Sequence, residues 1–165
     1  MLVLGIDPGT AITGYGLVRE DGAGLTLVDY GVITTPAGQP LPERLQAIYQ
    51  GLAQVARKHQ PHEAAVEELF FSRNARTALS VGHARGVTLL ALADAGLPIH
   101  EYKPLEIKQA ITGYGGAGKQ QVQEMVRLLL NLDHVPQPDD AADAVAVAVC
   151  HLHSARMAAA IEDAR

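Results

Sequence analysis

Tryptophan, disulfides and long apolar runs are missing from this chain of 165 residues, and Cys150 is its one cysteine. A single cysteine cannot pair within the chain, which favours a reducing compartment over a secreted disulfide scaffold. We expect no membrane span, because the apolar runs are too short. The opening residues MLVLGIDPG also lack the basic segment and long apolar stretch of a signal peptide. We therefore predict a cytoplasmic protein.

Aromatic side chains are scarce, at 4%, although apolar residues make up 48% of the chain. The core must therefore be built mainly from Ala, Val, Leu and Ile. The length suits one substantial core, so we predict a single domain over residues 1–165.

The net charge of −5, taken alone, argues mildly against a nucleic-acid partner. The distribution of charge argues the other way. Residues 73–127 contain seven Lys and Arg against four Asp and Glu, a balance of +3. The acidic residues gather in the flanks, where bound cations would offset them. Charge alone leaves both a solvated surface and a nucleic-acid interface open.

The order of predicted elements indicates an α/β fold. Three strands joined by short turns come first, and strands then alternate with helices, which predicts a five-stranded mixed sheet with helices on both faces. We expect strands at 2–7, 14–19, 25–34, 64–67 and 98–102, and helices at 41–58, 74–95, 104–112, 119–132 and 139–159.

Four carboxylates are expected to converge from three separate segments. Asp7 ends the first strand beside a Pro-Gly turn, and Glu67 ends the fourth strand. If these strands are neighbours, both side chains reach one edge of the sheet. Asp140 and Asp143 stand three residues apart at the start of the last helix, so they share a helix face.

Carboxylates crowded in this way repel each other, and their pKa values rise. A pair of divalent cations would remove that penalty, and ligands that are all oxygen suit Mg²⁺, with Mn²⁺ as a substitute. Two such ions can hold the attacking water and the leaving oxygen of an in-line phosphoryl displacement. The acids therefore predict hydrolysis of a phosphodiester without a covalent intermediate.

Each acid also has a purely structural explanation, which the sequence leaves open. Asp7 could bond its own Pro-Gly turn. Glu67 or Glu68 could be a solvated strand end, and nothing local decides which of them faces inward. The acids that open the last helix could be there because the helix dipole favours them. The cluster is stronger evidence than any single member.

Four segments, in order over nearly the whole chain, resemble the bacterial RuvC resolvases. They are GIDPGTAITGYGLV (5–18), AVEELFFSRNARTALSVGHARG (65–86), EYKPLEIKQAITGYGGAGKQQVQEMVRLLL (101–130) and DDAADAVAVAVCH (139–151). The resemblance implies a ribonuclease H-like fold and a homodimer that works with a RuvA–RuvB branch-migration complex. It also implies a Mg²⁺-dependent endodeoxyribonuclease that resolves Holliday junctions by paired symmetric nicks.

The resemblance also implies which acids are catalytic and hold two Mg²⁺ ions. The family's four acids match Asp7, Glu67, Asp140 and Asp143. This chain has an additional acid, Asp139, where the family pattern does not expect one. Asp139 also shares a helix face with Asp143, so it remains the alternative ligand.

Several residues are implied as DNA contacts. Phe70 matches a family aromatic that stacks on bases, an interaction of about 1–3 kcal/mol per base, although Phe70 or its neighbour could instead pack in the core. Lys108 and Lys119 match family lysines near the active site and could neutralise phosphate charge; as solvated helix ends they would need no such role. Weaker candidates for backbone contact are Arg73, Arg76 and Lys103.

A homodimer would suit the implied substrate, because a four-way junction is nearly two-fold symmetric and matched cuts need two related sites. The helix at 74–95 is expected to form the dimer interface through a face rich in Ala and Gly, although that face could instead pack on the sheet of its own chain. We do not expect a zinc site at His151 and His153. A helix would place them on different faces, and no second ligand pair has a suitable spacing.

Three other functions are compatible with parts of the pattern. An actin-like phosphotransferase also opens with an Asp-Gly-Thr turn, but it needs two such domains in a much longer chain. A non-catalytic junction-binding scaffold would bind the same DNA without needing the four acids. A related ribonuclease H-like nuclease acting on RNA ends would differ only in its substrate.

Overall fold

The computed structural model describes residues 1–68 and 75–163 of the chain. Its elements follow the predicted order. They are β1 (Leu2–Asp7), β2 (Ile12–Asp21), β3 (Gly24–Thr34), α1 (Leu41–His59), β4 (Glu63–Glu67), α2 (Ala75–Asp94), β5 (Ile99–Tyr102), α3 (Pro104–Thr112), α4 (Lys119–Leu129) and α5 (Asp139–Asp163).

The five strands form one mixed sheet in the order β3-β2-β1-β4-β5. β1, β2 and β3 pair antiparallel, because only tight turns connect them. β4 lies parallel to β1, and β5 lies parallel to β4, since a helix precedes each of them in the chain. The structure confirms the predicted α/β fold and its five-stranded mixed sheet.

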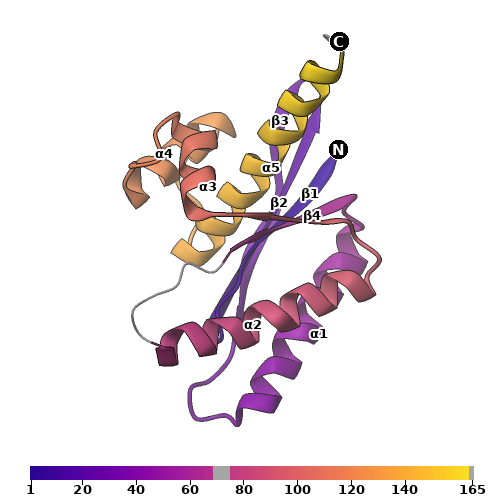
Figure 1. Ribbon diagram of the computed structural model, residues 1–165, viewed down its shortest axis with the longest axis vertical. Helices are drawn as coiled ribbons and strands as arrows, with labels where there is room; N and C mark the ends of the chain where they lie inside the picture. Colours follow the sequence, from indigo (N-terminus) through magenta and orange to yellow (C-terminus); the bar gives the residue numbers. More distant parts are fainter. Residues whose placement is uncertain (69–74, 164–165) are drawn as a thin grey trace.

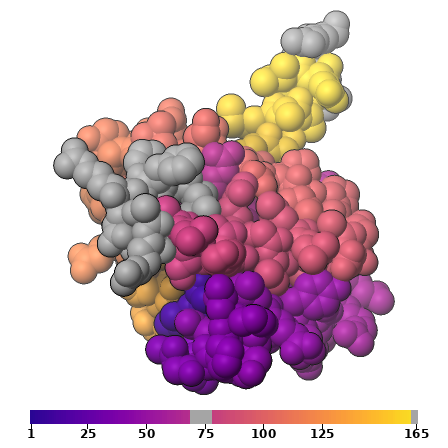
Figure 2. All heavy atoms as spheres, turned by 60° about the horizontal axis from the view of Figure 1, so that its bottom comes forward, coloured from indigo at the N-terminus to yellow at the C-terminus, as the bar shows by residue number. Residues whose placement is uncertain are grey.

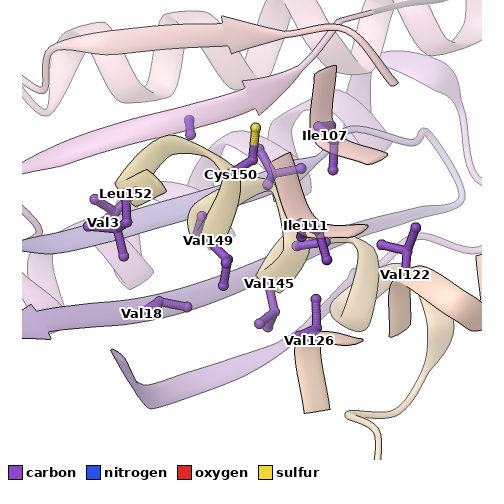
Figure 3. Packing of buried hydrophobic residues seen from close by; sticks show 14 of the residues in the cluster. Val3, Val18, Ile107, Ile111, Val122, Val126, Val145, Val149, Cys150 and Leu152 are labelled. Carbon is purple, nitrogen blue, oxygen red and sulfur yellow. The ribbon is translucent and has the colours of Figure 1, made fainter. Parts of the chain in front are cut away.

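Helices cover both faces of the sheet, as predicted (Figure 1). Because successive strand residues point to opposite faces, Leu4 and Ile6 of β1 pack with α1 and α2, whereas Val3 packs with α3, α4 and α5. Figure 3 shows the second of these layers, in which aliphatic side chains from the strands and the three helices interdigitate around Val145 and Val149 of α5.

α4 ends earlier than predicted, at Leu129 rather than at residue 132. Asn131 adopts a left-handed backbone conformation, with φ of 50°, and the Leu132 amide donates to the Arg127 carbonyl at 2.9 Å. A left-handed residue with such a bond is a common way to end a helix. The apolar pattern continues past this point, which is why periodicity alone extended the helix.

α5 is longer than predicted, and it corrects the expectation that no segment is long enough to cross a membrane. Residues 139–162 are long and apolar enough for a span by length and composition only, and about 50% of the 18-residue stretch that meets the test is buried within the described protein. The helix is apolar because its first half is the central helix of the core, with Val145, Val147 and Val149 fully buried. Its last turns stand away from the body of the molecule (Figure 2).

Candidate active site

Asp7 and Glu67 lie at the ends of the two neighbouring central strands. β1 and β4 run parallel, with Ile6 opposite Val66, so the next position on each strand carries one of the two acids. A side-chain hydrogen bond links the two carboxyl groups. The structure therefore brings together the first two acids predicted from sequence, at one edge of the sheet.

The start of α5 brings Asp140 and Asp143 to the same edge, because α5 lies directly against the sheet. Glycines in the strands make this approach possible. A Cβ atom on Gly14 of β2 would overlap the backbone oxygen of Asp140, and one on Gly5 of β1 would overlap the backbone oxygen of Ala144. Only residues without a side chain fit at these two positions, so they set how closely the helix approaches.

The electrostatics of Asp7 show how tightly the acids are grouped. Burial and, in that order, the charges of Glu67, Asp143 and Asp140 together raise the pKa of Asp7 to about 8. Burial and the Asp143 charge also raise the pKa of Glu67, against the lowering effects of its bond to Asp7 and of Lys119 and Lys108. Asp7 is therefore within electrostatic reach of the other three predicted acids.

This donor set fits divalent cations. A buried group of carboxylates is unfavourable unless protons or cations neutralise it, and the raised pKa values of Asp7 and Glu67 express that penalty. All the donors are hard carboxylate oxygens, which suit Mg²⁺ or Mn²⁺.

The two predicted lysines, Lys108 and Lys119, also lie at this place. They line one hollow together with Glu67 and Asp143. The Lys119 ammonium lies 2.8 Å from an Asp143 carboxylate oxygen and 3.3 Å from an Asp139 oxygen. These contacts raise the pKa of Lys119 despite its partial burial, so the side chain stays positively charged beside the acids.

Exposure, and not the contact with Lys119, separates Asp139 from the other acids. The Asp139 side chain is 57% exposed and pairs with Lys119, whereas the Asp143 side chain is 27% exposed. Asp140, not Asp139, is among the charges that raise the pKa of Asp7. The geometry therefore favours Asp140 over Asp139 as the fourth member of the cluster.

Two small hollows adjoin at Glu67 and Pro104. One, of about 190 Å³, is lined by Asp7, Glu68 and Arg85 among others, and the lysine-lined hollow has a volume of about 170 Å³. Both are smaller than the roughly 300–1,000 Å³ pockets that enclose small molecules. A larger hollow of about 430 Å³ lies at Tyr49, Arg57 and Asp94, away from the four acids. The acid-lined hollows suit a group presented on a larger partner, such as one phosphate of a polymer.

Arg85 is a residue of this site that sequence reasoning did not assign. It comes from α2, lines the hollow with Asp7 and Glu67, and pairs with Glu101 at 2.5 Å. Its buried Nε has no hydrogen-bond partner within the described residues. No local pattern distinguishes Arg85 from a solvated arginine, because its position depends on how α2 crosses the sheet.

The remaining predicted DNA contacts lie at two places: Lys103 directly precedes α3, and the others are in or beside the segment between β4 and α2. Phe70 and Arg73 lie outside the described residues, as does Asn74, the first residue of the helix predicted at 74–95. Arg76 falls in the first turn of α2. Their roles stay predictions.

Comparison with known proteins shows extensive similarity to one family. The model of a family described as crossover junction endodeoxyribonuclease RuvC matches residues 3–151. A crossover junction endodeoxyribonuclease RuvC of Chloroflexus aggregans is 62% identical over 155 residues, which are 94% of each chain. Thermus thermophilus RuvC has a similar structure, with a TM-score of 0.89 and 39% identity over 96% of this chain and 97% of that chain. T. thermophilus RuvC in complex with a Holliday junction substrate gives a TM-score of 0.87 and 38% identity, over 95% and 96% of the two chains.

Proposed function

The chain belongs to the RuvC family of crossover junction endodeoxyribonucleases, and from that premise we propose that it resolves four-way DNA junctions by paired symmetric nicks. Each nick is hydrolysis of a phosphodiester: a water oxygen bonds to phosphorus as the bond to the leaving ester oxygen breaks. The relative solved with a Holliday junction supports this substrate. The observation that carries the proposal is the convergence of four acids at one edge of the sheet, beside two lysines that line a hollow together with Glu67 and Asp143.

We propose that Asp7, Glu67, Asp140 and Asp143 hold two divalent cations, Mg²⁺ or its substitute Mn²⁺. When bound, these ions supply positive charge at the scissile phosphate and lower the pKa of water. Asp7 and Glu67 are anchored on central strands, so their carboxylates have fixed positions. Asp140 and Asp143 close the set from the helix side. The all-oxygen donors and the raised pKa values support this assignment.

Lys119 and Lys108 are proposed to neutralise phosphate charge. Lys119 stays protonated beside Asp143, and both lysines line the hollow that contains Glu67. A positive group at that point favours the approach of a DNA backbone to an otherwise acidic site. It also stabilises the extra negative charge that develops as the phosphodiester reacts.

The test is incubation of the purified protein with a synthetic mobile four-way junction, with and without Mg²⁺. We expect paired symmetric nicks that require Mg²⁺ and disappear in Asp7→Asn, while tight junction binding survives. Asp133→Asn, a change of the same chemistry at an exposed position, is the matched control and should cut normally. Cutting by Asp7→Asn at the wild-type rate, or cutting of linear duplex as fast as of junctions, would overturn the proposal.

A homodimer is proposed because matched nicks need two sites related by two-fold symmetry. On α2, Leu79 is 63% exposed and Leu90 is 55% exposed, which supports this helix as the dimer interface. Val87 of the same helix packs inward on the core, so only part of the predicted face is free. Leu79→Glu should shift the sedimenting species from dimer to monomer and uncouple the two nicks. An unchanged dimer would exclude this face.

A cytoplasmic location and cooperation with a RuvA–RuvB branch-migration complex are proposed on the strength of the family alone. Pull-down of the chain by a RuvA-bound junction, compared with the free junction, tests the second point.

A further inference from the structure

Glu63, His100 and His151 come together from three different elements. Glu63 begins β4, His100 lies on β5, and His151 lies on α5. The Nε2 atom of His151 is 2.7 Å from a Glu63 carboxylate oxygen, and the Nε2 atom of His100 is 3.1 Å from the same oxygen. One potential ligand atom from each side chain lies within 4.8 Å of the other two.

This group is separate from the proposed nuclease site. Glu63 and Glu67 are the two ends of β4, so their backbones are about 13 Å apart at about 3.3 Å per residue. His151 lies eight residues beyond Asp143 on α5, about 12 Å along the axis. The same strand and the same helix therefore carry one group of polar side chains at each end.

Tyr102 orients the buried histidine. The His151 side chain is 3% exposed, and its Nδ1 atom lies 2.8 Å from the Tyr102 hydroxyl. That bond occupies Nδ1 and leaves Nε2 facing Glu63. Histidines that bind metals are commonly fixed in this way through the ring nitrogen that does not touch the ion.

The chemistry of the three groups matches one class of ligand. Two imidazoles and one carboxylate are a known ligand set for Zn²⁺, with water in the fourth position. At bond lengths of about 2.0–2.2 Å, tetrahedral ligand atoms are about 3.3–3.6 Å apart, and the two histidine nitrogens here lie 2.7 Å and 3.1 Å from the Glu63 oxygen. The His100 side chain is 45% exposed and that of Glu63 29%, so the group opens to solvent, where an ion can enter and keep a water. Burial and the neighbouring His100 lower the pKa of His151, against the raising effect of its bond to Glu63, and so favour the neutral ring that a metal ion requires.

We propose that Glu63, His100 and His151 bind one Zn²⁺ ion, or a similar borderline transition-metal ion, that ties β4 and β5 to α5. Mg²⁺ does not compete for this site, because it prefers oxygen ligands. The ion joins segments far apart in the sequence, so it stabilises the folded chain without taking part in cleavage.

The experiment is titration of the full chain with Zn²⁺, and with Co²⁺ for its visible d–d absorption, in millimolar Mg²⁺ to occupy the carboxylate site. We expect one Zn²⁺ per chain and a Co²⁺ spectrum typical of nitrogen ligands in four- or five-coordinate geometry. Zn²⁺ should also raise the melting temperature in proportion to the logarithm of its concentration.

His100→Ala is the main variant, because this half-exposed side chain can be removed without opening the core. It should weaken Zn²⁺ binding by about 100-fold or more, and Tyr102→Phe, which removes only the orienting hydroxyl, by about 10–100-fold. His134→Ala, an exposed histidine elsewhere, is the matched control and should bind as wild type does. Circular dichroism on each variant checks folding.

Two results would overturn the proposal. The first is Zn²⁺ binding that is equally tight in wild type and His100→Ala. The second is binding that disappears in Asp7→Asn but persists in His100→Ala, since the ion would then belong to the carboxylate cluster. In either case Glu63 would simply accept hydrogen bonds from two histidines.

Discussion

Replacing Asp7 by asparagine should stabilise the metal-free protein while removing its nuclease activity. Asp7 has an ordinary pKa of 3.8, and burial and its acidic neighbours raise it to about 8 in the folded chain. Between these two values the folded protein binds a proton that the unfolded chain has released. Stability must therefore fall as the pH rises from about 4 to 8.

The size of this penalty follows from the same shift. Each pKa unit corresponds to about 1.4 kcal/mol, so roughly four units set a ceiling of about 5 kcal/mol near pH 8. Asparagine removes the charge, and its amide can donate to Glu67 in place of the Asp7 proton. Because the amide is itself a partly buried polar group, we expect the free energy of unfolding of Asp7→Asn to exceed that of the wild type near pH 8 by about 2 kcal/mol or more, and not by the full ceiling.

Urea unfolding in EDTA at several pH values between 5 and 8 measures this effect. The wild-type free energy of unfolding should fall steeply with pH, and that of Asp7→Asn much less. Adding Mg²⁺ should restore the wild type and affect the variant little, because the ion replaces the missing positive charge. Asp133→Asn should behave as wild type. Equal pH slopes for wild type and Asp7→Asn would refute the reasoning.

Three further predictions concern the same site. Asp140→Asn should slow junction cleavage on the order of 100-fold, a size typical of losing one active-site electrostatic contact. Asp139→Asn should cleave within a few-fold of the wild-type rate in the same assay, and the reverse ranking would assign the ligand role to Asp139. Lys119→Ala should weaken junction binding and reduce the salt dependence of the binding constant by about one phosphate contact, which a filter-binding series in salt would measure. Gly14→Ala should destabilise the protein by about 1–3 kcal/mol, because its Cβ overlaps the start of α5; thermal melting at wild-type values would show that the helix can move away freely.

Most of the fold follows from local pattern. The strand at Leu2–Asp7 and the helices at Leu41–His59 and Pro104–Thr112 follow from apolar periodicity, proline and turn residues. Helix ends were less predictable. The end of α4 depends on one residue, Asn131, adopting a left-handed conformation, while the apolar pattern continues beyond it.

The acids of the site were predictable because they stand at the ends of recognisable elements. The choice between Asp140 and Asp139 could not be made from the helix spacing, because both residues share a face with Asp143. Only the packing of α5 against β2 decides which of them lies near Asp7. The sequence also could not predict that Arg85 lies near Asp7, or that His151 lies near Glu63. The sequence argument against zinc concerned only His151 with His153, and His153 contacts the Ala110 carbonyl. It could not foresee ligands from other strands, since strand register brings them together.

The position of β1 and β4 inside the sheet has a consequence for how activity is lost. Each has a hydrogen-bonded strand on both sides, whereas β3 and β5 are at the edges. Edge segments of a protein open locally at low free energy, while central strands exchange their amide protons only when the whole domain opens. Asp7 and Glu67 therefore belong to the part of the molecule whose amide protons exchange most slowly. As denaturant is added, the chain should keep its active site until the whole domain unfolds cooperatively.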